Sequence, residues 1–263
     1  MIGIFDSGLG GLSAYKELRA LRPHEDYLYF GDTGRVPYGT RSKEILQKYT
    51  RQDIAFLRSR GVDAILAACG TVSSVVLDEI RDEYDLPIFG VVDAAAAAAV
   101  KATKNGRIGV LGTGATISSR AFERKIAALS GDALVIPRAC PLFVPLVENG
   151  YIARDCEVTR LVARDYLAPI KAAGADTLIL GCTHFPLISD ILTDLLDGVT
   201  LINAGAAAAA AVAASLPQSD PKKSGSASFF VSDNPANFDE IARIFLDGHT
   251  ISAEKVDIDK IEY

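Results

Sequence analysis

The sequence predicts an α/β fold made of two pseudo-symmetric doubly wound lobes, with mainly parallel sheets and an active-site cleft between the lobes. Three observations predict it. Short apolar runs alternate with longer helical patterns, the second half of the chain repeats motifs of the first, and each half places a cysteine just after an apolar run. Such alternation is typical of βα units, in which helices join parallel strands. Ligands of such folds bind beyond the carboxyl ends of the strands.

The apolar runs are the expected strands, and they lie at residues 2–5, 27–30, 64–68, 88–92, 108–111, 133–136, 177–180, 200–202 and 228–231. The segments between them carry helical periodicity. Residues 42–60 show it clearly, because Ile45, Leu46 and Leu57 fall close to one face of a helix. Gly61 is expected to end this helix.

The two halves of the chain carry similar motifs at similar offsets. Residues 3–8 (Gly-Ile-Phe-Asp-Ser-Gly) match residues 109–114 (Gly-Val-Leu-Gly-Thr-Gly). Residues 69–71 (Cys-Gly-Thr) match residues 182–184 (Cys-Thr-His). We therefore expect two lobes of similar structure, each with one cysteine at a strand end.

Two alanine tracts also lie about half a chain apart. Six alanines follow Asp93, and six more follow residues 203–205 (Asn-Ala-Gly). Alanine has the highest helix propensity, and Asp and Asn are good N-caps, so both tracts are expected to form closely packed helices. A sharper hypothesis makes them the crossovers between the lobes. One lobe is then residues 1–92 plus 205–263, and the other is residues 93–204.

Composition narrows the class of protein. The 263 residues are 49% hydrophobic, which is enough for one large domain or two of ordinary size. The formal net charge is -6 and basic residues are scattered, so we expect no nucleic-acid or membrane partner. No targeting segment is evident, and no apolar stretch approaches the roughly 18 residues of a spanning helix. We interpret the chain as a cytoplasmic protein that acts on a small molecule.

Two facing lobes with one thiol each can reach both faces of a carbon atom. Inverting a carbon that bears hydrogen requires removal of a proton on one side and delivery of a proton on the other. Cysteine suits both steps, because its ordinary pKa of about 8.5 keeps thiol and thiolate accessible near neutral pH. Cys69 and Cys182 are therefore candidate acid/base groups, with Asp6 and His184 as the groups that tune them.

A collinear series of motifs runs from Ile2 to about Ala207. Its members are Asp6-Ser7-Gly8-Leu9-Gly10-Gly11-Leu12, Gly31-Asp32-Thr33 with Arg35-Val36-Pro37-Tyr38-Gly39, Ala68-Cys69-Gly70-Thr71, Val110-Leu111-Gly112-Thr113-Gly114-Ala115-Thr116-Ile117, Cys140-Pro141-Leu142-Phe143-Val144-Pro145-Leu146-Val147-Glu148 and Leu180-Gly181-Cys182-Thr183-His184-Phe185-Pro186. In this order they resemble the glutamate racemases of the cofactor-independent aspartate/glutamate racemase superfamily. The series is far more specific than a single glycine-rich loop.

The resemblance implies a two-base racemase that interconverts L- and D-glutamate for peptidoglycan synthesis, without pyridoxal phosphate or a metal. It implies that Cys69 and Cys182 are the bases, that Asp6 and His184 assist them, and that Glu148 is a further acidic group near the site. The implied substrate contacts are Ser7, Pro37, Tyr38, Gly39, Gly70, Thr71, Thr113, Thr116 and Thr183. Because the family generally works as homodimers, we expect a homodimer here.

The chain departs from the family pattern at Gly70. The family usually reads Ala-Cys-Asn-Thr here, and the asparagine normally contacts substrate. Loss of its amide costs roughly 1 to 3 kcal/mol if the hydrogen bonds were buried. A water can replace the amide, or Gly70 can bring a backbone N–H nearer to the substrate. Weaker binding and altered specificity both stay open at this point.

Three other functions fit parts of the sequence. An aspartate racemase would use the same thiols with a smaller pocket. A ligand-binding or nucleotide-binding domain would use both cysteines for packing alone, although the glycine loop at residues 8–11 lacks the spacing and the lysine of a phosphate-binding loop. A structural zinc site would be built from Cys69, Cys182 and His184. We interpret Cys140 and Cys156 as structural residues.

Overall fold

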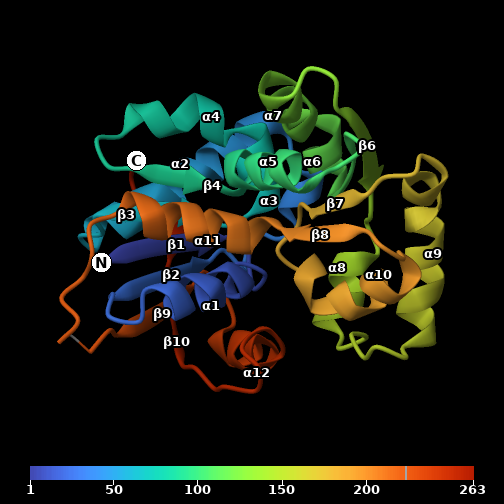
Figure 1. Cartoon of the computed structure of the whole chain (residues 1–263). Coiled ribbons are helices and arrows are strands. Elements are labelled where there is room, and N and C mark those ends of the chain that lie inside the picture. Colours follow the sequence, from blue (N-terminus) through green and yellow to red (C-terminus); the bar gives the residue numbers. More distant parts are fainter. Residues whose placement is uncertain (223) are drawn as a thin grey trace.

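Two parallel sheets form the framework of the protein, which is a computed structural model that describes residues 1–222 and 224–263 (Figure 1). In spatial order, the six-stranded sheet consists of β10 (Ala253–Lys255), β9 (Ala227–Val231), β2 (Tyr27–Gly31), β1 (Ile2–Asp6), β3 (Ala64–Ala67) and β4 (Ile88–Gly90). The four-stranded sheet consists of β6 (Leu134–Ala139), β5 (Arg107–Gly112), β7 (Thr177–Leu180) and β8 (Thr200–Asn203). All of these pairings are parallel. The predicted α/β class is therefore confirmed.

Helices alternate with the strands along the whole chain. The α-helices are α1 (Leu12–Leu21), α2 (Lys43–Ser59), α3 (Gly70–Val75), α4 (Leu77–Ile80), α5 (Val91–Ala102), α6 (Gly114–Ser118), α7 (Ala121–Leu129), α8 (Phe143–Glu148), α9 (Glu157–Ala172), α10 (Ser189–Leu195), α11 (Ala204–Ser215) and α12 (Pro235–Phe245). The short 3-10 helices are η1 (Tyr38–Thr40), η2 (Arg81–Glu83), η3 (Phe185–Ile188) and η4 (Ile258–Lys260). Within the described residues, none of the helices has the length and apolar character needed to cross a membrane.

The predicted strands are all present, with ends that differ by a few residues. The predicted strand at residues 88–92 ends at Gly90, because Val91 already begins α5. The sequence analysis missed β10. This strand has three residues, two of them charged and exposed, so it lacks the apolar run that marks a buried strand.

The helix expected at residues 42–60 is α2, and its ends follow the expected signals. Ser42 caps the helix, since its side chain accepts a hydrogen bond from the Ile45 N–H. Gly61 follows the helix with a φ of 75°, a conformation that glycine adopts without strain. Leu46 and Leu57 are buried as expected, whereas Ile45 is 38% exposed.

The chain passes between the two sheets through its two alanine-rich helices. Helix α5 leads from β4 to β5, and α11 leads from β8 back to β9 (Figure 1). The two helices pack against each other and bury the alanines Ala95, Ala96, Ala99, Ala208 and Ala209. Small side chains let helices approach closely, which holds the two sheets near one another. The expected packing of the alanine tracts is therefore confirmed.

Replacing Asn203 with alanine is expected to weaken the second crossover. Asn203 caps α11, because its Oδ1 accepts a hydrogen bond from the Ala206 N–H at 3.1 Å. The variant should lose about 1 kcal/mol of unfolding free energy, the usual cost of a lost N-cap. Urea denaturation followed by circular dichroism measures the loss. Asn203→Asp keeps the acceptor and should stay near the native stability; an equal loss in both variants would contradict the capping role.

Candidate active site

The two cysteine-bearing loops follow inner strands of the two sheets. Cys69 comes shortly after β3 of the six-stranded sheet, and Cys182 comes shortly after β7 of the four-stranded sheet. Their exposed fractions are 5% and 8%, and both side chains line one cavity of about 320 Å³. The structure therefore brings the two predicted acid/base groups into one site.

Loops from both sheets line this cavity. The predicted site residues in the lining are Ser7, Pro37, Tyr38, Gly39, Cys69, Gly70, Thr71, Thr113, Glu148, Cys182, Thr183 and His184. The sequence analysis did not assign a role to the other lining residues, which are Gly8, Leu9, Val36, Val144, Pro145 and Gly181. These residues all belong to the collinear motifs, so position within a motif is the signal that would have found them.

Two predicted site residues, Thr116 and Asp6, lie behind the lining. Thr116 is 1% exposed and accepts a hydrogen bond from the Thr113 hydroxyl at 3.0 Å, and that hydroxyl also lies 3.0 Å from Thr71 Oγ1. Asp6 is 1% exposed and accepts a hydrogen bond from the Gly8 N–H at 2.9 Å. In this arrangement both side chains contact residues of the lining.

His184 links Cys182 to Glu148. Its Nδ1 lies 3.8 Å from Cys182 Sγ, and its Nε2 lies 2.9 Å from Glu148 Oε1. Burial alone would lower the pKa of His184, but the hydrogen bonds and charges of Cys182 and Glu148 raise that pKa to about 10. The imidazole is therefore cationic at neutral pH and donates from both nitrogens. Phe245 packs edge-on against the ring, with the ring centroids 5.3 Å apart.

Cys69 lies in the opposite electrostatic environment. Its thiol points at Ser7 Oγ, 3.8 Å away. Burial, together with the negative charge of Asp6, raises the pKa of the Cys69 thiol to about 12. Burial also raises the pKa of Asp6, although the charge of His184 opposes this effect. The Cys69 side therefore favours the neutral thiol, whereas a cation lies beside Cys182.

The glycine at position 70 allows the two cysteine loops to touch. A Cβ atom on Gly70 would overlap the carbonyl oxygen of Gly181. The Ser13 hydroxyl of α1 donates to the carbonyl oxygen of Thr183 at 2.9 Å and so joins α1 to the Cys182 loop. With the loops in this position there is no room for the asparagine that the family usually carries.

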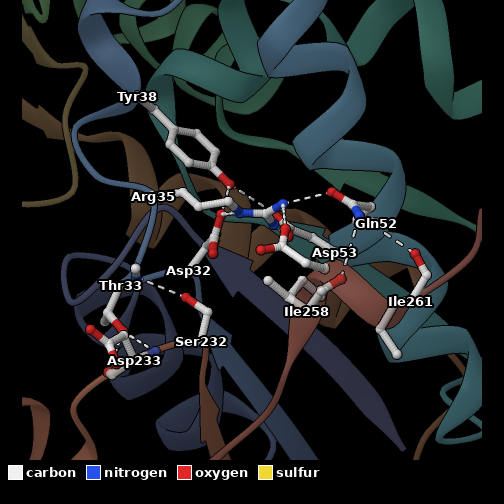
Figure 2. A network of polar contacts seen from close by, with 12 residues as sticks. Asp32, Thr33, Arg35, Tyr38, Gln52, Asp53, Ser232, Asp233, Ile258 and Ile261 are labelled. Carbon is white, nitrogen blue, oxygen red and sulfur yellow. Dashed lines mark hydrogen bonds and ion pairs between the residues drawn. The ribbon is translucent and has the colours of Figure 1, made fainter.

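Tyr38 lines the cavity, but its hydroxyl group points at two buried carboxylates, Asp32 and Asp53 (Figure 2). Arg35 forms ion pairs with the same carboxylates. The sequence analysis did not assign this cluster a role. Asp32 and Arg35 belong to the motif around Tyr38, whereas Asp53 lies in the middle of α2 and gave no sequence signal.

The remaining cysteines lie outside the cavity lining. Cys140 is 1% exposed, and its thiol donates to the Arg138 carbonyl oxygen at 3.6 Å. Cys156 is the N-cap residue of α9. Within residues 1–222 and 224–263, no group of three or more His, Cys, Asp and Glu side chains is arranged to hold a metal ion. The zinc-site hypothesis therefore gains no support from the geometry.

Comparisons of sequence and of structure agree on the family. The model of the Asp/Glu/Hydantoin racemase family matches residues 14–212. The glutamate racemase of Persephonella marina is 41% identical over 260 residues, which cover 99% of this chain and 98% of that relative. A glutamate racemase structure from Bacillus anthracis superposes with a TM-score of 0.93 at 33% sequence identity. A glutamate racemase from Francisella tularensis in complex with D-glutamate superposes with a TM-score of 0.90 at 34% sequence identity. Each match covers 98% of this chain and 97% of the other chain. The chain belongs to the Asp/Glu/Hydantoin racemase family.

Proposed function

We propose that the protein is a glutamate racemase, which interconverts L- and D-glutamate by proton transfer at the α-carbon. The observation that carries the proposal is that Cys69 and Cys182, which follow strands of different sheets, line one cavity of about 320 Å³. The relatives named glutamate racemase support glutamate as the substrate, as does the Francisella tularensis relative in complex with D-glutamate.

In the proposed reaction, one sulfur removes a proton and the other returns one. The Cys182 thiolate takes the α-proton, so that the C–H bond breaks and its electron pair stays on the substrate, conjugated with the carboxylate. The Cys69 thiol then delivers its proton to the opposite face, which forms a C–H bond of inverted configuration. The reverse reaction starts from the Cys69 thiolate and the Cys182 thiol and passes through the same intermediate.

The surroundings of the sulfurs support this starting state. The His184 imidazolium, paired with Glu148, can donate a hydrogen bond to an anionic Cys182 sulfur. Burial and the charge of Asp6 raise the pKa of Cys69, which keeps its proton available. We assign Asp6, Glu148 and His184 this supporting role.

Neutral donors are proposed to bind the two carboxylates of the substrate. Hydroxyl groups of Ser7, Thr71, Thr113 and Thr183 line the cavity, and the described lining contains neither lysine nor arginine. Hydroxyl groups and loop N–H groups bind carboxylates well when several of them converge.

The setting of the reaction is proposed from the family resemblance. We place the lobe boundaries within the crossovers, with residues 1–92 plus 205–263 in one lobe and residues 93–204 in the other. We also propose a cytoplasmic homodimer that supplies D-glutamate for peptidoglycan synthesis. Light scattering on purified protein tests the dimer.

The function is tested by proton NMR of L-glutamate with the purified protein in deuterated water under reducing conditions. The α-proton signal should disappear while the optical rotation decays toward zero. Aspartate serves as the comparison substrate. Exchange in aspartate and none in glutamate would replace the proposal with an aspartate racemase, and exchange in neither would reject racemisation of both acids.

Serine at Cys69 or at Cys182 is expected to slow racemisation by about 100- to 10,000-fold, because a hydroxyl group is a much weaker base than a thiolate. Circular dichroism of both glutamate enantiomers measures the rate. Cys140→Ser is the matched control, since Cys140 is also buried but lies outside the cavity lining. Full activity in either single active-site variant would contradict the two-thiol mechanism.

Glu148→Gln should move the alkaline limb of the pH profile to lower pH. The Glu148 carboxylate helps to raise the pKa of His184 to about 10, so its loss lowers that pKa and the imidazolium disappears earlier as the pH rises. Because the two enantiomers have equal free energy, kcat/KM must fall by the same factor in both directions. Rates measured from about pH 6 to about pH 10 give the profile; an unchanged alkaline limb would contradict the role of Glu148.

Gly70→Ala should lower kcat/KM by about tenfold, since a methyl group against the Gly181 carbonyl overpacks the contact by about 1 to 3 kcal/mol and separates the cysteine loops. Gly114→Ala is a matched control. Gly114 also begins a short helix after a strand, but a Cβ atom there would have no described atom within 4 Å. Equal activities of the two variants would show that position 70 does not set the loop contact.

A further inference from the structure

A cluster of buried polar side chains lies against the cavity wall formed by residues 36–39. It contains Asp32, Arg35, Tyr38, Gln52 and Asp53, and Figure 2 shows these side chains converging on the guanidinium group of Arg35. Asp32 and Asp53 are both fully buried, and Tyr38 is 2% exposed. The substrate cavity and this cluster therefore share one residue, Tyr38.

Arg35 is the cation at the centre of the cluster. Its Nε donates to Asp32 Oδ2 at 2.6 Å, and its Nη2 donates to Asp53 Oδ1 at 3.1 Å. Its Nη1 donates to Gln52 Oε1 at 2.6 Å, and its Cζ lies over the ring of Tyr49, 4.1 Å from the ring centre. If both buried carboxyl groups were ionised, the single guanidinium would face two negative charges. An unpaired buried charge is costly, so a proton on one carboxyl is favoured.

The hydroxyl group of Tyr38 indicates which carboxyl carries that proton. This hydroxyl makes a hydrogen bond to Asp32 Oδ2, and its oxygen lies 3.2 Å from Asp53 Oδ2. A phenol has one proton, so it cannot donate to both carboxylates. With the phenol proton directed at Asp32, a proton on Asp53 Oδ2 would complete the chain by donation to the Tyr38 oxygen.

The charges around Asp53 favour the same assignment. Burial, and next the charge of Asp32, raise the pKa of Asp53 well above its usual range, against the opposing charge of Arg35. The hydrogen bond with Tyr38 acts against this rise in pKa, and the charge of Asp6 acts in the same direction as Asp32. Arg35 also forms an ion pair with a third carboxylate, the exposed Asp259, whose Oδ1 lies 3.8 Å from Arg35 Nη1.

We propose that Asp53 is a positioning residue, held in its protonated form, whose hydrogen bond to the Tyr38 oxygen completes a chain from Asp53 through Tyr38 to Asp32 and fixes the cavity wall at residues 36–39. Its effect on catalysis rests on the proposed racemase function. Gln52 extends the cluster toward the carboxyl-terminal segment, because its Nε2 donates to the Ile258 carbonyl oxygen at 3.4 Å. The wall is thereby tied to a segment far away in the sequence.

Asparagine and alanine at position 53 test the positioning role. An asparagine side chain there would keep a donor toward Tyr38 and an acceptor for Arg35, so Asp53→Asn should leave KM for both glutamate enantiomers nearly unchanged. Asp53→Ala removes both contacts and should raise KM by about tenfold, which corresponds to about 1.4 kcal/mol, while kcat changes much less. Tyr38→Phe, which removes the hydroxyl and keeps the ring, should also raise KM. The proposal is overturned if Asp53→Asn raises KM as much as Asp53→Ala, or if neither alanine nor phenylalanine raises it.

The pH dependence of unfolding tests the protonated state without any substrate. A carboxyl with a raised folded-state pKa binds a proton in the native state that the unfolded chain has released, so its contribution to stability falls as the pH rises toward the folded-state pKa. Asp53→Asn lacks this effect. Between about pH 6 and about pH 8, the variant should therefore gain stability relative to the native protein as the pH rises, with a slope that corresponds to about one proton.

Asp85→Asn, at an exposed surface position, is the control for this slope and should parallel the native protein. Parallel curves for the native protein and Asp53→Asn would overturn the proposal, because they would show an ionised Asp53. Urea unfolding at each pH provides the measurement. Since no substrate is used, a failure of this result is distinguishable from a failure of the racemase function, which would leave the native protein itself inactive on glutamate.

Discussion

The backbone contact between Gly70 and Gly181 is the constraint on which the site depends. Because no side chain separates them, the loops after β3 and β7 meet, and their cysteines line the same cavity. Two alanine-rich crossovers make this approach of the sheets feasible, since α5 and α11 pack with small buried side chains between their axes. The same closeness leaves both thiols largely buried. Burial then becomes the largest influence on the pKa of Cys69.

Burial also strengthens the effect of nearby charges on each sulfur, and those charges differ on the two sides. The Cys182 side carries the His184 cation, whose raised pKa comes from its hydrogen bonds with Cys182 and with Glu148, which lies 2.9 Å from Nε2. The Cys69 side carries the buried carboxyl of Asp6. A two-base reaction needs one thiolate and one thiol at the same moment, and the asymmetry supplies that difference within the proposed steps. The two sides of the site therefore differ in the residues that set protonation.

A second group of buried charged side chains lies beside the cavity. The cluster around Arg35 places two carboxyl groups against one guanidinium, out of contact with water. A proton on Asp53 makes this cluster neutral and gives the Tyr38 oxygen a donor. The cavity wall is then supported by a hydrogen-bond chain of defined direction, and only Tyr38 of that chain lies in the lining. In the site around His184 and in the cluster around Arg35, a charged group is tolerated in the interior because a proton or an opposite charge compensates it.

Hydrophobic periodicity and strand-end motifs are local patterns, so the amino-acid sequence predicts the α/β class, the positions of the main strands, the packed alanine helices and the two cysteine loops. Most residues of the cavity lining are also predictable from the sequence, since they lie within the motifs. Three features follow only from the packed structure. They are the contact of Gly70 with Gly181, the positions of Thr116 and Asp6 behind the lining, and the cluster around Asp53. Gly70 and Asp53 meet partners from other elements of the fold, Gly181 for Gly70 and Tyr38 for Asp53. Such partners meet only after sheets and helices have packed, and no local pattern records them.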